Sequence, residues 1–401
     1  MLKFSARTDV GLKRRHNEDS LLAAEDFGLF VVADGVGGRK AGEIASALTV
    51  NTFQSYASQL KEAVDRCAAD PSRDTRNAVL HLLDQATNAA SRRVYEAANA
   101  TGRQGMTTTM VAALVGGGNA YVCHVGDSRA YLLRGGTLRQ LTEDHSMINE
   151  LVRNGAMRPD DPAAAQYKNV ITRAVGLYPQ VKTDTLFVEL VGNDRLVLCT
   201  DGLSDMVEPK KLQDLVGTPD LTKGSDLLIQ AALDGGGRDN VTVVLIDPEA
   251  TQEAEAVAAR ARVMESLFLF EDLPYQARLR VGRIMSELYL MPGQPVMRQG
   301  EAGNTMYVVV QGEVGVVVDG KEVAVLGEGE HFGEIALVDN QPRSASVVAR
   351  GFGMLLAIDR DALREFCMME PALGNMMLWK LLATLSERLR RANAQLVSRP
   401  T

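Results

Sequence analysis

The chain has 401 residues, 46% of them hydrophobic and 23% charged, with a formal net charge of −8 and a pI near 5.4. This length and composition predict two or three ordinary globular domains, and the lack of a basic domain argues against nucleic-acid binding. The four cysteines are scattered without a CxxC pair and no apolar run could span a bilayer, so we expect a reduced, cytoplasmic protein with no zinc site and no membrane partner.

The first elements in chain order predict a mixed fold. Residues 29–38, LFVVADGVGG, form a buried strand that ends in Asp34 and glycines, and an isolated Asp-Gly pair after a strand favours a hairpin turn. Two long segments, about 41–67 and 74–100, have helical periodicity. Between Thr107 and Thr142 short strands follow one another across tight glycine turns, and connections this short require antiparallel pairing.

Two further strands, LVLCTDG at 196–202 and NVTVVLID at 240–247, complete this half of the chain. The fold class is therefore α+β, with antiparallel sheets covered by helices. An Ala/Glu/Arg-rich stretch at 249–265 predicts a connector helix. Short glycine-punctuated strands resume after it and a helical tail follows, so the expected domains are 1–248 and 266–401.

Carboxylates recur at the ends of the predicted strands. Asp34, Asp127 and Asp201 follow apolar strands, Asp239 precedes one, and Asp19 lies just before the first strand pattern. Separate turns explain each of them alone, but five converging carboxylates would repel one another unless a cation joined them. No Cys or His stands at ligand spacing, so such a site would suit Mg²⁺ or Mn²⁺ rather than zinc. Spacing alone leaves both interpretations open.

Six motifs, RRHNED, VVADGVGG, GDSRAY, LTEDHS, CTDGLSDM and GGRDNVTVV, resemble in their order those of type 2C metal-dependent protein Ser/Thr phosphatases. The resemblance covers about residues 1–247 and implies a two-sheet sandwich with helices outside and a binuclear metal centre at one end. By motif match it implies the following metal ligands: Asp19, Asp34, the Gly35 carbonyl, Asp201 and Asp239. It also implies Glu18 acting through water, a third and weaker ion at Asp127 and Asp205, and Arg14 binding the substrate phosphate.

The resemblance further implies a reaction in which two Mg²⁺ or Mn²⁺ ions lower the pKa of a water that attacks phosphorus. The Arg14 guanidinium suits the phosphate because its fork meets two oxygens at once. Many relatives have a histidine after the Asp-Gly pair, proposed as the general acid, whereas Val36 stands there in this chain. His145 is one substitute, but we expect it to be structural, at the start of a flap over 145–176. Cys199, beside Asp201, is expected in the core.

The second half contains EHFGEIALVDNQPRSASVV at 330–348. A helix N-terminus at Gly333 to Ala336 offers backbone N–H groups to an anion, Arg343 supplies a cation, and Glu334 can accept hydrogen bonds from hydroxyls. Together these groups suit a sugar phosphate, although their spacing alone favours an ordinary surface ion pair.

FGEIALVDNQPRSA resembles, without a gap, the phosphate-binding cassette of the cyclic-nucleotide-binding domains of catabolite activator proteins and cyclic-nucleotide-dependent kinases. This resemblance covers about residues 266–398 and implies a β-roll with flanking helices. It implies that Gly333, Glu334 and Ala336 contact ribose and phosphate, that Arg343 pairs with the cyclic phosphate, and that Ser344 adjoins it. Serine at this position favours cAMP over cGMP as the regulatory ligand.

The helical tail carries apolar residues at alternating four- and three-residue steps: Leu378, Leu382, Leu385, Leu389, Ala392 and Leu396. This seam either packs on the β-roll or pairs with a second chain as a homodimeric coiled coil. Trp379, the single tryptophan, either packs on the roll or caps a nucleotide base.

Three functions are compatible with these features. We favour a phosphatase that hydrolyses phosphoserine and phosphothreonine in protein substrates and is regulated by a cyclic nucleotide. The alternative keeps the enzyme but makes the C-terminal domain a docking or dimerisation module that binds no nucleotide. A non-catalytic sensor is disfavoured by the complete set of Asp19, Asp34, Asp201 and Asp239.

Overall fold

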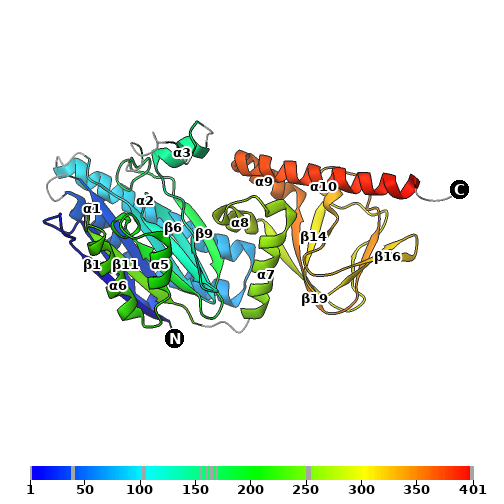
Figure 1. Cartoon of the computed structure of the whole chain (residues 1–401), viewed down its shortest axis with the longest axis horizontal. Coiled ribbons are helices and arrows are strands. Elements are labelled where there is room, and N and C mark those ends of the chain that lie inside the picture. The colour runs from blue at the N-terminus through cyan, green and yellow to red at the C-terminus, as the bar shows by residue number, and fades with distance from the viewer. Residues whose placement is uncertain are drawn as a thin grey trace. The chain divides into compact units, whose positions relative to one another are not determined.

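The computed structural model describes residues 2–37, 41–101, 105–153, 156–158, 161, 167, 170–249 and 254–397. The chain divides into two compact units, Met1–Ala254 and Glu255–Thr401. Each unit contains two antiparallel sheets with helices outside them (Figure 1). No helix within the described residues is both long enough and apolar enough to cross a membrane.

The first unit is a sandwich of a five-stranded and a six-stranded sheet. The five strands, in spatial order, are β1 (Lys3–Asp9), β11 (Val241–Asp247), β10 (Arg195–Cys199), β7 (Arg129–Arg134) and β8 (Thr137–Gln140). The six strands are β2 (Asp19–Ala24), β3 (Leu29–Val36), β5 (Met110–Gly116), β6 (Asn119–Val125) and β9 (Asp184–Glu189), with β4 (Thr107–Thr108) paired to β3. Phe4 and Phe30 meet across the two sheets, with ring centroids 5.4 Å apart.

Helices cover both outer faces of the sandwich, as the sequence predicts. The long helices α1 (Ala41–Ala69) and α2 (Arg73–Thr101) pack on the six-stranded sheet through a core that includes Phe53, Leu60 and Leu83. On the other face lie α4 (Asp201–Ser204), α5 (Pro209–Val216) and α6 (Leu221–Asp234), while α3 (Met147–Arg153) belongs to the predicted flap (Figure 1). Most of the flap's residues 154–169 fall outside the described residues.

The expectation of antiparallel pairing across short connections holds for two hairpins and fails for a third connection. Strands β5 and β6 pair, and so do β7 and β8. Strands β6 and β7 do not pair, although only residues 126–128 separate them, because the chain passes there from one sheet to the other. Gly126 has a φ of 104°, a conformation that glycine adopts without strain. The crossing brings Asp127 to the edge where both sheets end.

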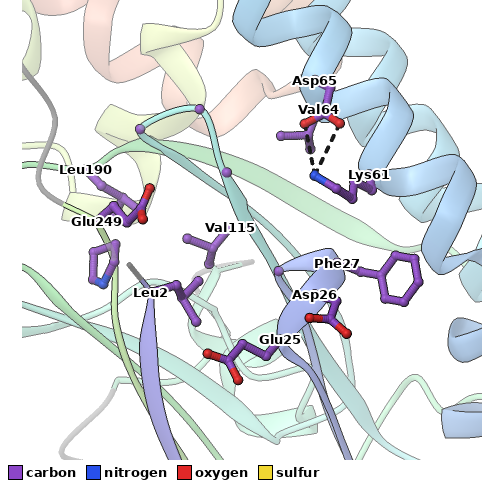
Figure 2. A pocket seen from close by; sticks show the side chains of 15 residues that line it. Leu2, Glu25, Asp26, Phe27, Lys61, Val64, Asp65, Val115, Leu190 and Glu249 are labelled. Carbon is purple, nitrogen blue, oxygen red and sulfur yellow. Dashed lines mark hydrogen bonds and ion pairs between the residues drawn. The ribbon is translucent and has the colours of Figure 1, made fainter.

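A cavity of about 330 Å³ lies at the opposite end of the sandwich, where β3 begins. Figure 2 shows Glu25, Asp26 and Glu249 around it, and Lys61 paired with Asp65 on α1. Asp34 lies six positions after Gly28 of this cavity along an extended chain, which corresponds to about 20 Å. The cavity is therefore remote from the acidic cluster described below.

The second unit is a β-roll of two four-stranded sheets. One contains β12 (Met285–Leu290), β19 (Gly353–Asp359), β14 (Thr305–Gln311) and β17 (His331–Phe332). The other contains β13 (Pro295–Met297), β18 (Ser346–Ala349), β15 (Val314–Val318) and β16 (Lys321–Leu326). The described part of this unit also has two 3₁₀ turns: η3 (Phe268–Phe270) precedes the first strand, and η4 (Glu334–Leu337) lies between β17 and β18.

Four helices accompany the roll: α7 (Ala254–Ser266), α8 (Tyr275–Gly282), α9 (Arg360–Met369) and α10 (Pro371–Val397). The helix expected over 249–265 therefore begins at Ala254, and residues 250–253 lie outside the described residues. Ala259 and Val263 of α7 are buried in the same core as Met377 and Leu381 of α10. The predicted connector is thus an integral part of the second unit.

Candidate active site and candidate ligand cavity

Acidic side chains gather at the end of the sandwich where β3 ends. Asp19 opens β2 and lies directly opposite Asp34 of β3 in the antiparallel register. Like charges in such positions destabilise a sheet. Burial and the charges of the neighbouring aspartates raise the pKa of Asp34 well above its usual range, and burial raises the pKa of Asp19 to about 7.

Three more aspartates converge on this pair. Asp201 follows β10 at the start of α4, Asp239 precedes β11, and Asp127 lies in the connection between β6 and β7. Burial, followed by the charge of Asp239, raises the pKa of Asp201. Burial and the charge of Asp201 raise the pKa of Asp127 to about 7. The structure therefore brings together all five carboxylates that the sequence places at strand ends.

The carboxylate oxygens of Asp19 have different surroundings. Its Oδ2 accepts hydrogen bonds from the hydroxyls of Thr242, at 2.6 Å, and Thr200, at 3.1 Å. Its Oδ1 is buried without a hydrogen-bond partner among the described residues, and so is Oδ1 of Asp201. Buried polar atoms are almost always paired, so unpaired carboxylate oxygens in an acidic cluster fit a hard divalent cation.

Two features define the backbone around the cluster: a close approach of Gly35 to Gly42, and the hydrogen bonds of Asn240. A Cβ on Gly35 would lie 2.2 Å from the carbonyl oxygen of Gly42 in α1, and a Cβ on Gly42 would lie 2.6 Å from the carbonyl oxygen of Gly35. Asn240 supports the loop before β2, since its Oδ1 accepts from the Glu18 N–H at 2.7 Å. Its Nδ2 donates to the carbonyl oxygens of Val10 and His16.

Sequence patterns did not identify Asn240, Thr200 or Thr242 as site residues. A signal was available, because each lies one to three residues from a predicted metal ligand, within CTDG or DNVTVV. The hydroxyls of Thr200 and Thr242 donate to Asp19, and Asn240 holds the backbone of the loop before β2, where an apolar residue would suit a buried strand end better.

Arg14 lies at the rim of the cluster. Its Nη2 is 2.7 Å from Oδ2 of Asp239, and about half of its side chain is exposed. The hydrogen bond to Asp239 raises the pKa of Arg14, and burial raises the pKa of nearby Glu18. A guanidinium in this position can meet an incoming phosphate.

His145 is enclosed at the base of the flap. Its Nδ1 accepts from the Gly126 N–H at 3.1 Å, so Nε2 carries the proton and faces Oδ2 of Asp184 at 3.2 Å. The ring of His124 stacks on it at 4.6 Å. The types of these side chains would suit a metal ion, but Arg173 already supplies Asp184 with a cation at 2.8 Å. These contacts support a structural role for His145.

The second unit contains a cavity of about 520 Å³ beside η4. All five residues predicted for a nucleotide site line it: Gly333, Glu334, Ala336, Arg343 and Ser344. Gly333 has a φ of 77° and directly precedes η4. The first backbone N–H groups of such a turn have no hydrogen-bond partner within the turn, so they can donate to a ligand.

Arg343 is the buried cation of this cavity, with 9% of the residue exposed. Its Nη2 donates to the Thr305 carbonyl oxygen at 2.8 Å and its Nη1 to that of Gly333 at 3.4 Å. Among the described residues no carboxylate lies within ion-pair distance of it. Burial lowers the pKa of Arg343, and a buried charge of this kind is costly without a counter-ion. The arrangement suits an anionic ligand.

The C-terminal helix differs from both expectations for Trp379. This side chain is 67% exposed and does not line the cavity, so in the structure it neither packs on the roll nor caps the ligand position. Among the described side chains of α10, Arg388 lines the cavity, as does His331 of β17. Sequence patterns missed both, because only the folded helix brings Arg388 to this position.

Comparisons with known proteins give a family for each of the two units. The sequence model of the family described as protein phosphatase 2C matches residues 13–225, and that of the cyclic nucleotide-binding domain matches residues 287–370. The serine/threonine phosphatase stp of Listeria welshimeri is 36% identical over 251 residues, which is 62% of this chain and 96% of that protein.

Two solved structures cover the same region. The Mycobacterium tuberculosis serine/threonine phosphatase PstP superimposes with a TM-score of 0.55 at 35% identity, over 62% of this chain and 99% of that one. The catalytic domain of PstP in complex with two manganese ions gives a TM-score of 0.52 at 35% identity, over 61% of this chain and 97% of that one. This chain is therefore a protein phosphatase of the 2C family that carries a cyclic nucleotide-binding domain in its C-terminal unit.

Proposed function

We propose that the chain is a metal-dependent protein serine/threonine phosphatase that binds two Mn²⁺ or Mg²⁺ ions and is regulated by a cyclic nucleotide. The observation that carries the catalytic part is the acidic cluster with its buried, unpaired oxygens on Asp19 and Asp201. The residues assigned to the two ions are Asp19, Asp34, the Gly35 carbonyl, Asp201 and Asp239. Glu18 acts through water, and Asp127 with Asp205 holds a third ion.

Bound divalent ions would supply a water of lowered pKa as the nucleophile. The protein's own contribution is to hold the ligands and the substrate in position. Hydrogen bonds from Thr200 and Thr242 fix one oxygen of Asp19 so that the other points into the cluster. Arg14 exchanges its contact with Asp239 for the substrate phosphate, and the two guanidinium donors orient the phosphoryl group.

In the second unit, Arg343 pairs with the cyclic phosphate while Gly333, Glu334 and Ala336 contact phosphate and ribose. The buried, uncompensated guanidinium supports this assignment. Ser344 favours cAMP over cGMP. A cytoplasmic location is supported by four free cysteines, three of them buried, since cytosolic thiols stay reduced.

A second candidate keeps the phosphatase but uses the C-terminal unit for homodimerisation. The specific observation in its favour is the apolar surface of α10, where Leu378, Leu382 and Leu389 are 43%, 53% and 63% exposed. Leu385 packs partly against the core, and nothing is described for the side chains of Ala392 and Leu396. The response to cyclic nucleotide, measured below, separates this candidate from the first.

The test of the catalytic part is Mn²⁺-dependent hydrolysis of a small aryl phosphate, together with Mn²⁺ binding by calorimetry. We expect Asp201→Asn to abolish turnover and weaken Mn²⁺ binding, because it removes one ligand charge. Asp226→Asn is the matched control, since Asp226 is 57% exposed and pairs with Arg7 outside the cluster. Near-normal Mn²⁺ binding and turnover in Asp201→Asn would overturn the assignment.

A further inference from the structure

Basic side chains gather on one side of the acidic cluster, on two loops that border it. The loop between β1 and β2 contributes Lys13, Arg14 and Arg15, which follow one another directly in the chain. The loop between α6 and β11 contributes Arg238, immediately before the aspartate at position 239. All four basic side chains are exposed to solvent.

The two loops are fixed against each other by backbone hydrogen bonds. The Leu12 N–H donates to the Gly237 carbonyl oxygen at 2.8 Å. Nδ2 of Asn240 donates to the carbonyl oxygens of Val10, at 2.9 Å, and His16, at 3.0 Å. The basic residues therefore belong to one continuous surface rather than to two independent segments.

Arg14 and Asp239 place this surface beside the position proposed for the substrate phosphate. Nη2 of Arg14 lies 2.7 Å from Oδ2 of Asp239, so this pair joins the two loops at the edge of the acidic cluster. Arg15 and Arg238 are each one residue away from a member of the pair, which is about 3.8 Å along the backbone. A peptide whose phosphate reaches Arg14 therefore brings its neighbouring residues close to Arg15 and Arg238.

Three of the four cations have no acidic partner. Within the part of the chain that the structure describes, no carboxylate lies at ion-pair distance from Lys13, Arg15 or Arg238. The whole chain has a net charge of −8, so this local excess of positive charge runs against its composition. Uncompensated cations of one sign on a fixed surface attract a partner of the opposite charge and determine which partner binds.

We propose that Lys13, Arg15 and Arg238 form a basic rim that binds acidic residues flanking the phosphorylated serine or threonine of the substrate. The enzyme thereby prefers phosphopeptides that carry glutamate or aspartate beside the phosphorylated residue. Arg14 is assigned to the phosphate, which leaves the three other cations to the flanking carboxylates. This inference rests on the phosphatase part of the proposed function and names its substrate class.

The experiment measures kcat/KM for three phosphothreonine peptides that differ only in their flanking residues, which are glutamate, glutamine or lysine. One exposed ion pair contributes a factor of about 1.4 to 5, so two or three of them predict that the glutamate peptide is preferred over the glutamine peptide by about five- to thirtyfold. The difference should arise mainly in KM. It should shrink when NaCl is raised from about 50 mM to about 500 mM, because salt screens exposed charges.

The double variant Arg15→Gln with Arg238→Gln should lower this preference by at least about threefold, because it removes two of the three cations. Its hydrolysis of a small aryl phosphate should change much less than its peptide preference, since that substrate has no flanking residues. Arg15→Glu with Arg238→Glu should reverse the order, so that the lysine peptide becomes the preferred one.

Arg66→Gln with Arg73→Gln is the matched control, because it removes the same charge from exposed positions near the end of α1 and at the start of α2. The residue beside Arg66, Asp65, lines the cavity at the opposite end of the sandwich. The control should keep the full preference for the glutamate peptide, and melting curves should show that all variants are folded.

The outcomes separate this inference from the proposed function. A wild type that does not hydrolyse the aryl phosphate would defeat the phosphatase function, and the basic rim would fall with it. A wild type that hydrolyses the aryl phosphate but treats the glutamate and glutamine peptides equally would overturn the basic rim alone. A preference that persists unchanged in Arg15→Gln with Arg238→Gln would also overturn it, because recognition of acidic residues would then lie elsewhere.

Discussion

The hydrogen bonds of Asp19 leave one of its two carboxylate oxygens available to a cation. Two threonine hydroxyls satisfy one oxygen of its carboxylate, and the other oxygen is left without a protein partner in a buried position. The hydroxyls lower the pKa of Asp19 while burial and the neighbouring aspartates raise it, and burial has the larger effect. Without a metal ion this end of the sandwich is therefore a source of instability.

The raised pKa values predict an unusual pH dependence for the metal-free protein. Asp19 and Asp127 have pKa values of about 7 in the folded state, above the value of about 3.9 for an unfolded aspartate. The folded state binds more protons between these values, so stability is highest at low pH and falls as pH rises through about 7. We expect the melting temperature in chelator to fall between pH 5.5 and pH 8.

Saturating Mn²⁺ should remove most of this fall, because the ion neutralises the repelling carboxylates. The gain in melting temperature from Mn²⁺ should therefore be larger at pH 8 than at pH 5.5. Asp127→Asn should flatten the pH dependence in chelator. A melting temperature in chelator that rises from pH 5.5 to pH 8 would contradict the expectation.

Substitutions at His145 separate a structural role from general acid catalysis. Its Nδ1 is used by the Gly126 N–H and its Nε2 by Asp184, and the residue is 3% exposed. We expect His145→Asn, which keeps an acceptor near the Nδ1 position, to lower the melting temperature less than His145→Gln or His145→Ala. General acids contribute about 10²–10⁴-fold where the leaving group needs a proton, as the serine or threonine alkoxide does, so phosphopeptide turnover reduced by less than a hundredfold in His145→Ala would exclude that role. A loss as deep as that of Asp201→Asn would contradict the structural role.

At the scale of elements, the sequence was most informative where structure is local. The two long helices and the hairpins β5–β6 and β7–β8 follow from periodicity and from short turns. The passage of the chain between the sheets at residues 126–128 could not be predicted in this way, because a short connection looks the same whether or not its strands pair. Tertiary packing decides whether the strands on either side of a short connection pair with each other.

The acidic cluster and the ligand cavity likewise combine residues that local sequence indicates with residues that only the folded chain brings there. The aspartates stand at strand ends within ordered motifs, so the sequence could indicate them as a group. The hydroxyls that orient Asp19 and the Arg388 guanidinium that pairs with Glu334 come from other parts of the chain. They depend on the register of β11 and on the path of α10, and no local pattern specifies either.

Helix α10 has a solvent-exposed apolar face that dimerisation would cover. Among the described side chains of the helix, Met377 and Leu381 are buried apolar residues, whereas Leu378, Leu382 and Leu389 face outward. If the seam pairs with a second chain, Leu382→Glu with Leu389→Glu should convert a dimer into a monomer in sedimentation experiments, because buried like charges oppose association. Met368→Glu, at an equally exposed position on α9, is the control. A wild type that sediments as a monomer at high micromolar concentration would exclude this role.

At the scale of the molecule, the two units can communicate only if the ligand distinguishes two conformations. Helix α7 belongs to the core of the second unit, so a rearrangement there includes the segment that leads back to the first unit. We expect cyclic nucleotide to change phosphopeptide hydrolysis by several-fold up to about a hundredfold, the usual range of such coupling. Arg343→Leu should retain basal activity and lose the response, since it removes the phosphate's counter-ion and no metal ligand.

The measurement is phosphopeptide hydrolysis by wild type and Arg343→Leu across cAMP and cGMP titrations. A flat wild-type response to both nucleotides would defeat the coupling and favour the dimerisation module. An equal response in Arg343→Leu would instead place the effect outside this cavity.

The contact between Gly35 and Gly42 limits which amino-acid substitutions this enzyme can tolerate. A methyl group at either position would collide with the backbone of the other, at 2.2 Å and 2.6 Å. Both residues are already the smallest available, so no second substitution can make room for the first. In a library of random variants neither position should acquire a tolerated replacement, alone or with a partner. The junction between the strand that carries Asp34 and helix α1 then admits glycine alone on both sides.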